Sequence, residues 1–271
     1  MKKNLIIIRV LVMAFLLSLV PDFSMSRDNQ PATPVKLCFI HHSCGSNWLK
    51  SNDGRLGIIL NRNNYYVTES YYGWSAEPGD NLGNRTDTRN WPLWFNNTKM
   101  PYVYKNNSHY SYENTIADPG SENSIIMFKS CYPCSEVGDS IDDEKKIYNE
   151  LLAYFAKHTD KLFILVTPPG ETRVSSWKLT KELCQWLASK NGWLKNYPHK
   201  NVGVFDFYCV LSEKGSHHRV KDGSVEYVYA PNYDGVSPYH NNDDHPNSEG
   251  NRKAAEEFIT ILNMYYNNWK K

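Results

Sequence analysis

The sequence lacks an excess of charge of either sign. It carries 30 basic and 29 acidic residues among its 271, which gives a formal net charge of +1. Domains that bind nucleic acid usually show a clear basic surplus, so the balance argues against a nucleic-acid partner. Internal repeats and low-complexity tracts are also lacking, which excludes repeat arrays and long disordered segments.

Long apolar runs are lacking except at the N-terminus. Two lysines precede an apolar run from Leu5 to Val20, and Ser24-Met25-Ser26 then offers small residues suited to cleavage. Arg9 interrupts the run and leaves fewer apolar residues than the ~20 that a membrane-spanning helix needs. We therefore predict a signal peptide at 1–26, a secreted or periplasmic protein, and no stable membrane insertion. Cleavage would leave 27 basic and 28 acidic residues.

The rest of the chain alternates apolar runs with amphipathic helical patterns, and we expect a linker at 27–34 and one domain at 35–271. The strand candidates are Val35–Ile40, Tyr65–Tyr72, Ser124–Ser130, Lys161–Thr167 and Val202–Phe207. The helix candidates are Asp142–His158, Leu179–Trp193 and Glu249–Tyr265. Strands that are apolar throughout are typical of parallel sheets buried on both faces. The pattern predicts an α/β fold, a doubly wound and mostly parallel sheet of about five strands with helices on both faces.

Two long stretches, 74–120 and 213–242, interrupt the alternation of strands and helices. Both are rich in Asn, Gly, Tyr and Asp. Long loops inside a compact domain are usually functional or mobile. We therefore expect these two stretches to be functional or mobile.

All six cysteines lie in the part of the chain predicted to be exported, and an even number there favours disulfides. They are Cys38, Cys44, Cys131, Cys134, Cys184 and Cys209. Cys131-Tyr132-Pro133-Cys134 has the spacing of a thiol–disulfide motif, but it follows the third strand, whereas redox folds place it near the N-terminus. A disulfide from Cys131 to Cys44, a Cys131–Cys134 bridge and free thiols all remain open.

A serine stands just past the first predicted strand, in His41-His42-Ser43-Cys44-Gly45. Ligands of doubly wound sheets bind at the carboxyl ends of the strands, so the Ser43 hydroxyl would project from the functional edge. Backbone N–H groups around Ser43 would face the same point and could stabilise an oxyanion. Alternatively, Ser43 serves only as a helix cap.

A histidine with neighbouring acids precedes the last predicted helix, in Asp243-Asp244-His245-Pro246. A serine hydroxyl needs a base near neutral pH, and imidazole is the side chain whose pKa lies there. Asp243 or Asp244 would fix the imidazole tautomer and stabilise its charged form. The last helix is expected to pack beside the first strand and carry His245 to Ser43.

These two blocks resemble those of the SGNH, or GDSL, hydrolases. His245-Pro246-Asn247-Ser248-Glu249-Gly250 is similar to the C-terminal block of that family, and Leu165–Pro169 and Val204–Tyr208 are similar to its later strands. The chain looks like a branch with His-His-Ser in place of Gly-Asp-Ser. The resemblance spans roughly 35–265 and implies a flavodoxin-like fold, no cofactor, and a serine esterase that removes acyl groups, such as O-acetyl, from carbohydrate or related esters.

The chain departs from the family in the groups around the catalytic pair. Gly73 matches the oxyanion glycine by position only, and Ser130 stands near the place where the oxyanion asparagine is absent. The usual acid, three residues before the histidine, is Asn242, so Asp243 or Asp244 would have to replace it. A literal Gly138-Asp139-Ser140 does not follow an apolar strand, and Ser140 is better interpreted as a helix cap.

Other functions stay open beside the esterase. Because the oxyanion asparagine and usual acid are missing, an inactive carbohydrate-binding protein is the alternative, and 19 Tyr and 8 Trp would suit sugar ligands. A thiol oxidoreductase is a weaker third. No metal site is predicted, because His41 and His42 would point to opposite faces of a strand and His217-His218 lies in a loop where solvation is expected. The sequence does not indicate an oligomeric state.

Overall fold

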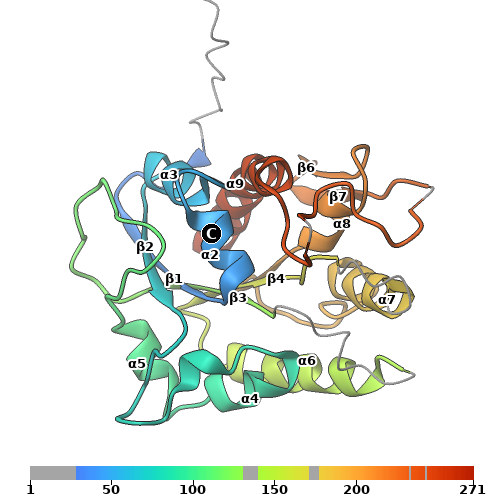
Figure 1. Ribbon diagram of the computed structural model, residues 1–271. Helices are drawn as coiled ribbons and strands as arrows, with labels where there is room; N and C mark the ends of the chain where they lie inside the picture. The colour runs from blue at the N-terminus through green and yellow to red at the C-terminus, as the bar shows by residue number, and fades with distance from the viewer. Residues whose placement is uncertain (1–28, 131–139, 171–176, 232, 242) are drawn as a thin grey trace, which may run out of the picture.

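The computed structural model describes residues 29–130, 140–170, 177–231, 233–241 and 243–271 (Figure 1). The predicted signal peptide, the Cys131–Cys134 motif and Asn242 lie outside these residues. Within the described ranges, no helix combines the length and apolar character needed to cross a membrane.

Five parallel strands form the central sheet, in the order β2-β1-β3-β4-β5. They are β1 (Val35–Ile40), β2 (Tyr65–Ser70), β3 (Ile125–Lys129), β4 (Leu162–Val166) and β5 (Val202–Phe205). Each lies inside a range predicted from its apolar content. The predicted α/β fold with a five-stranded parallel sheet is confirmed.

Each strand is apolar throughout because both faces of the sheet are covered. In β1, Leu37 and Phe39 enter one hydrophobic core, and Cys38 and Ile40 enter the other. Alternate residues of a strand point to opposite faces, so a strand buried on both faces shows no polar alternation. Each face of the sheet thus has its own hydrophobic core, and helices must cover both faces to bury them, which gives the doubly wound architecture.

Helices cover both faces of the sheet (Figure 1). One face carries α2 (Ser43–Leu49), α3 (Leu56–Arg62), α8 (Phe207–Ser212) and α9 (Ser248–Lys270). The other carries α4 (Trp91–Trp94), α5 (Met100–Tyr104), α6 (Asp142–Phe155) and α7 (Trp177–Ala188), with the short 3-10 turns η2 (Leu82–Asn84) and η3 (Thr88–Asn90) before them.

The stretch 213–242 contains a β-hairpin that the sequence interpretation missed. Strands β6 (His217–Lys221) and β7 (Ser224–Val228) pair antiparallel. Asp222 and Gly223 form the turn with φ of 50° and 71°. Positive φ at both central residues is typical of the two-residue hairpin turn, for which Asp-Gly is a favoured sequence. The same hairpin corrects the expected solvation of His218, which is buried in β6.

Several predicted boundaries differ from those of the structure, and two of the differences have clear local reasons. Helix α7 ends at Ala188 instead of Trp193, and the Ser189 side chain accepts a hydrogen bond from the Asn191 backbone at 3.2 Å. Strand β5 ends at Phe205, because the Asp206 side chain accepts the Cys209 N–H at 3.1 Å and starts α8. Serine and aspartate side chains that bond to nearby backbone N–H groups compete with the backbone hydrogen bonds that would extend a strand or helix.

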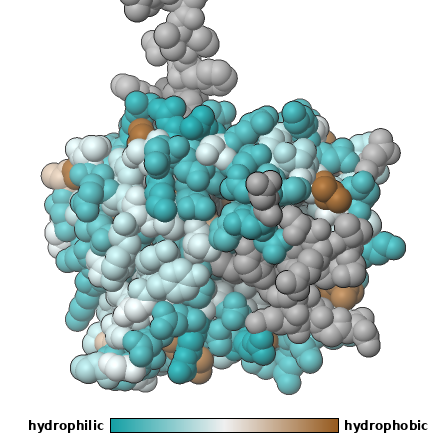
Figure 2. Space-filling view, viewed as in Figure 1, coloured by the Kyte–Doolittle hydropathy of each residue, from teal (hydrophilic) through white to brown (hydrophobic). Residues whose placement is uncertain are grey.

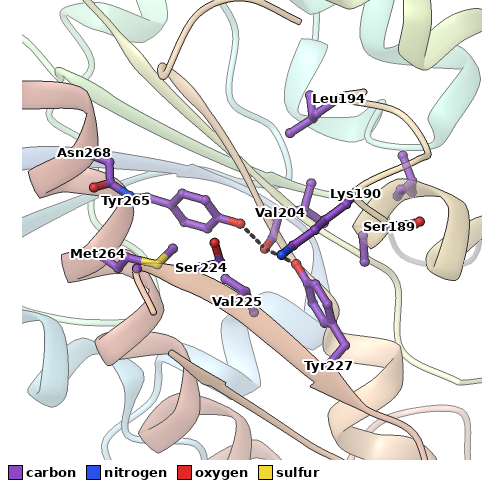
Figure 3. Close-up of a pocket in the computed structure, with 13 residues that line it drawn as sticks. Ser189, Lys190, Leu194, Val204, Ser224, Val225, Tyr227, Met264, Tyr265 and Asn268 are labelled. Carbon is purple, nitrogen blue, oxygen red and sulfur yellow. Dashed lines mark hydrogen bonds between the residues drawn. The ribbon is translucent and has the colours of Figure 1, made fainter. Parts of the chain in front are cut away.

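Side chains occupy backbone groups at both edges of the sheet. At the β2 edge, Asn114 accepts the Val67 N–H at 2.8 Å and donates to the Val67 carbonyl at 2.7 Å. At the β5 edge, the hydroxyls of Tyr227 and Tyr265 donate to the Val204 carbonyl at 3.2 and 3.1 Å (Figure 3). Both edges therefore hydrogen-bond to groups outside the sheet.

The four described cysteines are all buried, and no disulfide joins them to one another. They are Cys38, Cys44, Cys184 and Cys209. The disulfides that the even count favoured are therefore not supported among these residues. The proposed partner of Cys44, Cys131, lies outside the described residues.

The face shown in Figure 2 is mostly hydrophilic, with hydrophobic residues scattered singly over it. Leu93 and Val236 are among the exposed large hydrophobic side chains of the described chain. Isolated apolar residues of this kind are normal at a protein surface.

Candidate active site

Ser43 begins α2 at the carboxyl end of β1. His42 precedes it in extended conformation and does not cap the helix with its side chain. Gly45 lies directly over the His41 ring, where an added Cβ would fall 2.5 Å from the His41 Cβ. The glycine two residues after the serine is thus needed to let the helix start so close to the strand.

The structure brings Ser43 and His245 together across the carboxyl edge of the sheet. Ser43 Oγ lies 2.8 Å from His245 Nε2, a hydrogen-bonding distance between residues 202 positions apart. Nucleophile and base within such reach are the signature of nucleophilic catalysis. Ser43 and His245 are both half-buried.

A short antiparallel loop holds His245 in place. The Asn241 N–H donates to the His245 carbonyl at 2.9 Å, and the Asn247 N–H donates to the Tyr239 carbonyl at 2.6 Å. The Asn247 side chain then caps α9 by accepting the Gly250 N–H at 2.9 Å. The imidazole therefore projects from a loop fixed at the entry to a helix of 23 residues.

Asp243 is the acid in contact with the imidazole. Its Oδ1 lies 3.2 Å from His245 Nδ1 and accepts the His245 backbone N–H at 2.9 Å. These contacts hold the pKa of the Asp243 carboxyl below its ordinary value, with the backbone hydrogen bond contributing most. Nδ1 and Oδ1 are at ion-pair distance without the alignment of a hydrogen bond. The Asp243 carboxylate is therefore positioned to act on the His245 imidazole through its charge more than through a hydrogen bond that would orient the ring. Asp244, the other candidate, lies half-buried beside it.

His41 forms a buried ion pair beneath the serine. Its Nε2 lies 3.0 Å from Glu69 Oε2, and its Nδ1 lies 2.8 Å from the His42 carbonyl oxygen. Both ring nitrogens of His41 therefore face oxygen acceptors. Burial favours a raised pKa for Glu69, but hydrogen bonds and charge from His41, together with Ser111, lower that pKa to about 2.

The role of His42, left open by the sequence, is to join Ser43 to the stretch 74–120. His42 Nε2 donates to the Gly83 carbonyl at 2.7 Å. Its ring stacks on Tyr72, with centroids 4.0 Å apart. His41 and His42 therefore have separate hydrogen-bond partners.

The two candidate oxyanion groups differ in their hydrogen bonding. Gly73 has φ of 77°, and its N–H donates to Asn84 Oδ1 at 2.8 Å, so this N–H is already engaged. Ser130 follows β3, and its buried hydroxyl has no partner among the described residues. Asn84 itself, next to the Gly83 that His42 binds, was not foreseen.

Glu69 and Asn84 are the site-forming residues that sequence reasoning missed. Glu69 was detectable in principle, because it is a carboxylate in an otherwise largely apolar and aromatic strand. Asn84 lies in a stretch that contains many asparagines, and nothing in the sequence distinguishes it from the others. Ser140, the serine of the literal Gly-Asp-Ser, is exposed at the entry to α6, where its Oγ accepts the Asp142 N–H at 3.1 Å.

A separate cleft lies at the β5 edge (Figure 3). The end of α7, the β6–β7 hairpin and α9 line it, through residues that include Lys190, Ser224 and Met264. None of its lining residues belongs to the Ser43–His245 pair. The cleft is therefore distinct from the candidate active site.

The fold and site define a doubly wound α/β protein with a serine, a histidine and an aspartate in contact at the carboxyl edge of its sheet. The chain is similar in overall path to the crystal structure of a proposed acylhydrolase from Bacteroides fragilis NCTC 9343. The TM-score is 0.48 and the identity 11%, over 91% of this chain and 97% of that one. No protein-family model and no curated protein sequence matches the chain.

Proposed function

We propose that this protein is an exported serine esterase that removes acyl groups, with O-acetyl groups on carbohydrate as the substrate class. The observation that carries the proposal is the 2.8 Å contact between Ser43 Oγ and His245 Nε2, with the Asp243 carboxylate 3.2 Å behind the imidazole. Export rests on the N-terminal sequence alone.

In this mechanism Ser43 Oγ attacks the ester carbonyl while His245 Nε2 takes its proton. The Asp243 carboxylate stabilises the imidazolium that forms. The tetrahedral intermediate collapses, and His245 returns the proton to the leaving alcohol. Water then attacks the acyl-serine by the same route, with His245 again as base, and releases the carboxylic acid.

The oxyanion is bound by the backbone N–H of Ser43 and by Asn84. Asn84 supports this role because its Oδ1 is held by the Gly73 N–H, which leaves its amide nitrogen as the donor. The Gly83 carbonyl beside it is bonded to His42, the residue before the nucleophile. This arrangement would supply the donor that the missing family asparagine normally provides.

Aromatic rings beside the nucleophile support a carbohydrate substrate. Tyr72 and Tyr110 are 45% and 52% exposed, and both lie against Tyr71, with centroids 4.7 and 5.7 Å from its ring. Flat rings with a polar hydroxyl suit sugar faces and their rims. Since Tyr72 stacks on His42, a sugar bound there would lie within reach of Ser43.

The test is turnover of p-nitrophenyl acetate by Ser43→Ala. Loss of a triad member costs on the order of 10⁴-fold or more in rate, so this variant should be inactive while remaining folded. Ser140→Ala is the matched control and should keep full activity. Full activity of Ser43→Ala, or loss of activity in Ser140→Ala alone, contradicts the assignment.

A carbohydrate-binding protein without activity is the second candidate. The observation that favours it is the imperfect alignment of Asp243 with His245 Nδ1. Binding of acetylated glycan without labelling of Ser43 by a fluorophosphonate would select this function. Labelling that disappears in Ser43→Ala would select the esterase.

A further inference from the structure

Three potential metal ligands lie together behind the carboxyl end of β5. Asp206 precedes α8, Cys209 lies within α8 and His218 lies in β6. One ligand atom from each residue lies within 4.8 Å of the other two. Asp206 and Cys209 are fully buried, and His218 is only 4% exposed. We call this group the Asp206 cluster.

The His218 imidazole is oriented as metal-binding histidines usually are. Its Nδ1 lies 3.3 Å from Glu257 Oε2, and its backbone N–H donates to the same oxygen at 2.6 Å. Its other nitrogen, Nε2, is buried and has no partner among the described residues. In metal sites, a histidine commonly binds the ion through one ring nitrogen and donates the N–H of the other to a carboxylate.

A buried imidazole nitrogen without a partner is costly, because the lone pair has lost water and gained nothing. Phe205 and Tyr227 pack against the ring, with centroids 4.8 and 4.9 Å away. Lys253 holds Glu257 from the other side at 3.1 Å. The ring is thus fixed by its surroundings while Nε2 stays available to a ligand.

The geometry points to a structural site for a divalent transition-metal ion, Zn²⁺ by its ligand chemistry, held by Asp206, Cys209 and His218. Thiolate, imidazole and carboxylate are the ligand types that zinc prefers, at bond lengths of ~2.0–2.3 Å. Donors at tetrahedral positions around such an ion lie ~3.5 Å apart. The ligand atoms of the cluster would therefore have to move about 1 Å closer together to bind one ion. The Tyr229 hydroxyl, which donates to Asp206 Oδ2, or a water can complete four ligands.

Charge balance supports a divalent ion. The Asp206 carboxylate and a Cys209 thiolate carry two negative charges, so Zn²⁺ would make the buried site neutral, as low-dielectric surroundings require. Binding would break the Cys209 S–H bond, form the metal–sulfur bond and release one proton to solvent.

The site would join three elements of the fold. Asp206 and Cys209 hold the start of α8, His218 holds the hairpin, and Glu257 connects the site to α9. In the sheet, β3 and β4 separate β5 from the β1 that leads to Ser43. The ion would thus stabilise the fold around α9 without touching the reacting atoms.

The test uses the full mature chain, stripped with a chelator and then dialysed against Zn²⁺ or Co²⁺. One ion per chain should bind, Co²⁺ should show thiolate-to-metal charge-transfer absorption, and Tm should rise by about 5–10 °C at 100-fold excess over Kd. Cys209→Ala and His218→Gln should lose the ion and the Tm shift. Cys38→Ala, which removes another buried thiol, should keep both.

Cys131 and Cys134 are alternative thiol ligands, and a Cys131→Ser/Cys134→Ser variant separates them from the cluster. Retention of the ion in this variant supports the Asp206 cluster. Absence of charge-transfer absorption in the wild-type chain overturns the proposal without any variant. Loss of the ion only in the Cys131/Cys134 variant, with retention in Cys209→Ala or His218→Gln, overturns it as well.

Discussion

His41 and Glu69 form an ion pair that is fully buried under the turn carrying Ser43, with 3.0 Å between Nε2 and Oε2. The other Glu69 oxygen accepts the backbone N–H groups of Tyr110, Ser111 and Tyr112 at 3.0, 2.9 and 3.3 Å. One carboxylate therefore connects the turn that carries Ser43 to the loop that bears the exposed Tyr110.

Glu69 should make stability fall with acid in a defined pH range. Its pKa is about 2 in the folded protein against an ordinary 4.5, so its contribution is complete above pH ~4.5 and disappears as pH falls toward 2. The shift corresponds to a contribution on the order of 3 kcal/mol. Urea unfolding at several pH values should show this slope in the wild type and a flatter one in Glu69→Gln.

Glu69→Gln should also destabilise the protein at pH 7 by about 3–5 kcal/mol, because it removes the carboxylate from a fully buried pair and leaves His41 without that partner. The matched control is Glu226→Gln, which removes the partner of Arg219 in an ion pair at the surface and should change stability little. Equal effects of the two substitutions would contradict the importance of the buried pair.

Gly45→Ala should disturb the position of Ser43, although it adds only one methyl group. The new methyl would lie 2.5 Å from the His41 Cβ and 2.8 Å from its Nδ1, so the ring or the start of α2 must move. We expect a loss of stability of about 1–3 kcal/mol and a lower kcat. Thermal unfolding and p-nitrophenyl acetate turnover measure both. Gly215→Ala, where no atom lies within 4 Å of the new Cβ, should leave both unchanged.

Asp243→Asn should reduce kcat more than Asp244→Asn. The Asp243 carboxylate is the one at 3.2 Å from His245 Nδ1, and its loss removes the charge that stabilises the imidazolium. Because Asp243 is exposed and loosely aligned, we expect a reduction on the order of 10²-fold, less than the ~10⁴ of a buried triad acid. Steady-state kinetics of the two variants decide between the acids. The reverse order would assign the role to Asp244.

Asn84→Asp should lower kcat by about 10²–10³-fold with little effect on KM, because it removes a donor to the oxyanion. It keeps an oxygen to accept the Gly73 N–H, whereas Asn84→Ala frees that N–H to bind the oxyanion in its place. We therefore expect Asn84→Ala to retain more activity than Asn84→Asp. Asn191→Ala, an exposed asparagine after α7, serves as control. Unchanged kcat in Asn84→Asp would exclude the donor role.

The sheet and the meeting of Ser43 with His245 were accessible from sequence because each depends on local patterns. Apolar runs marked the strands, and the residues following a strand or preceding a helix fall at its carboxyl edge in this architecture. The β6–β7 hairpin could also have been predicted, since Asp222-Gly223 is a hairpin signal. It was missed because its strands are polar and lack the apolar pattern of the other strands.

The contacts that support the site were not accessible. Glu69 meets His41 from the neighbouring strand, 28 residues away, and His218 meets Glu257 across 39 residues. Pairings of this kind depend on strand order and register, which apolar patterns alone do not specify. Two adjacent histidines in a polar stretch suggested solvation, and only the packing of the hairpin on α9 shows that one of them is buried.

The side chains at the two sheet edges have a consequence for self-association. Asn114 hydrogen-bonds to both backbone groups of Val67, and Tyr227 and Tyr265 donate to the Val204 carbonyl. These backbone groups are therefore not free to pair with an incoming strand. Unpaired edges are the usual template for intermolecular pairing. Growth of the central sheet from chain to chain is therefore blocked at these positions.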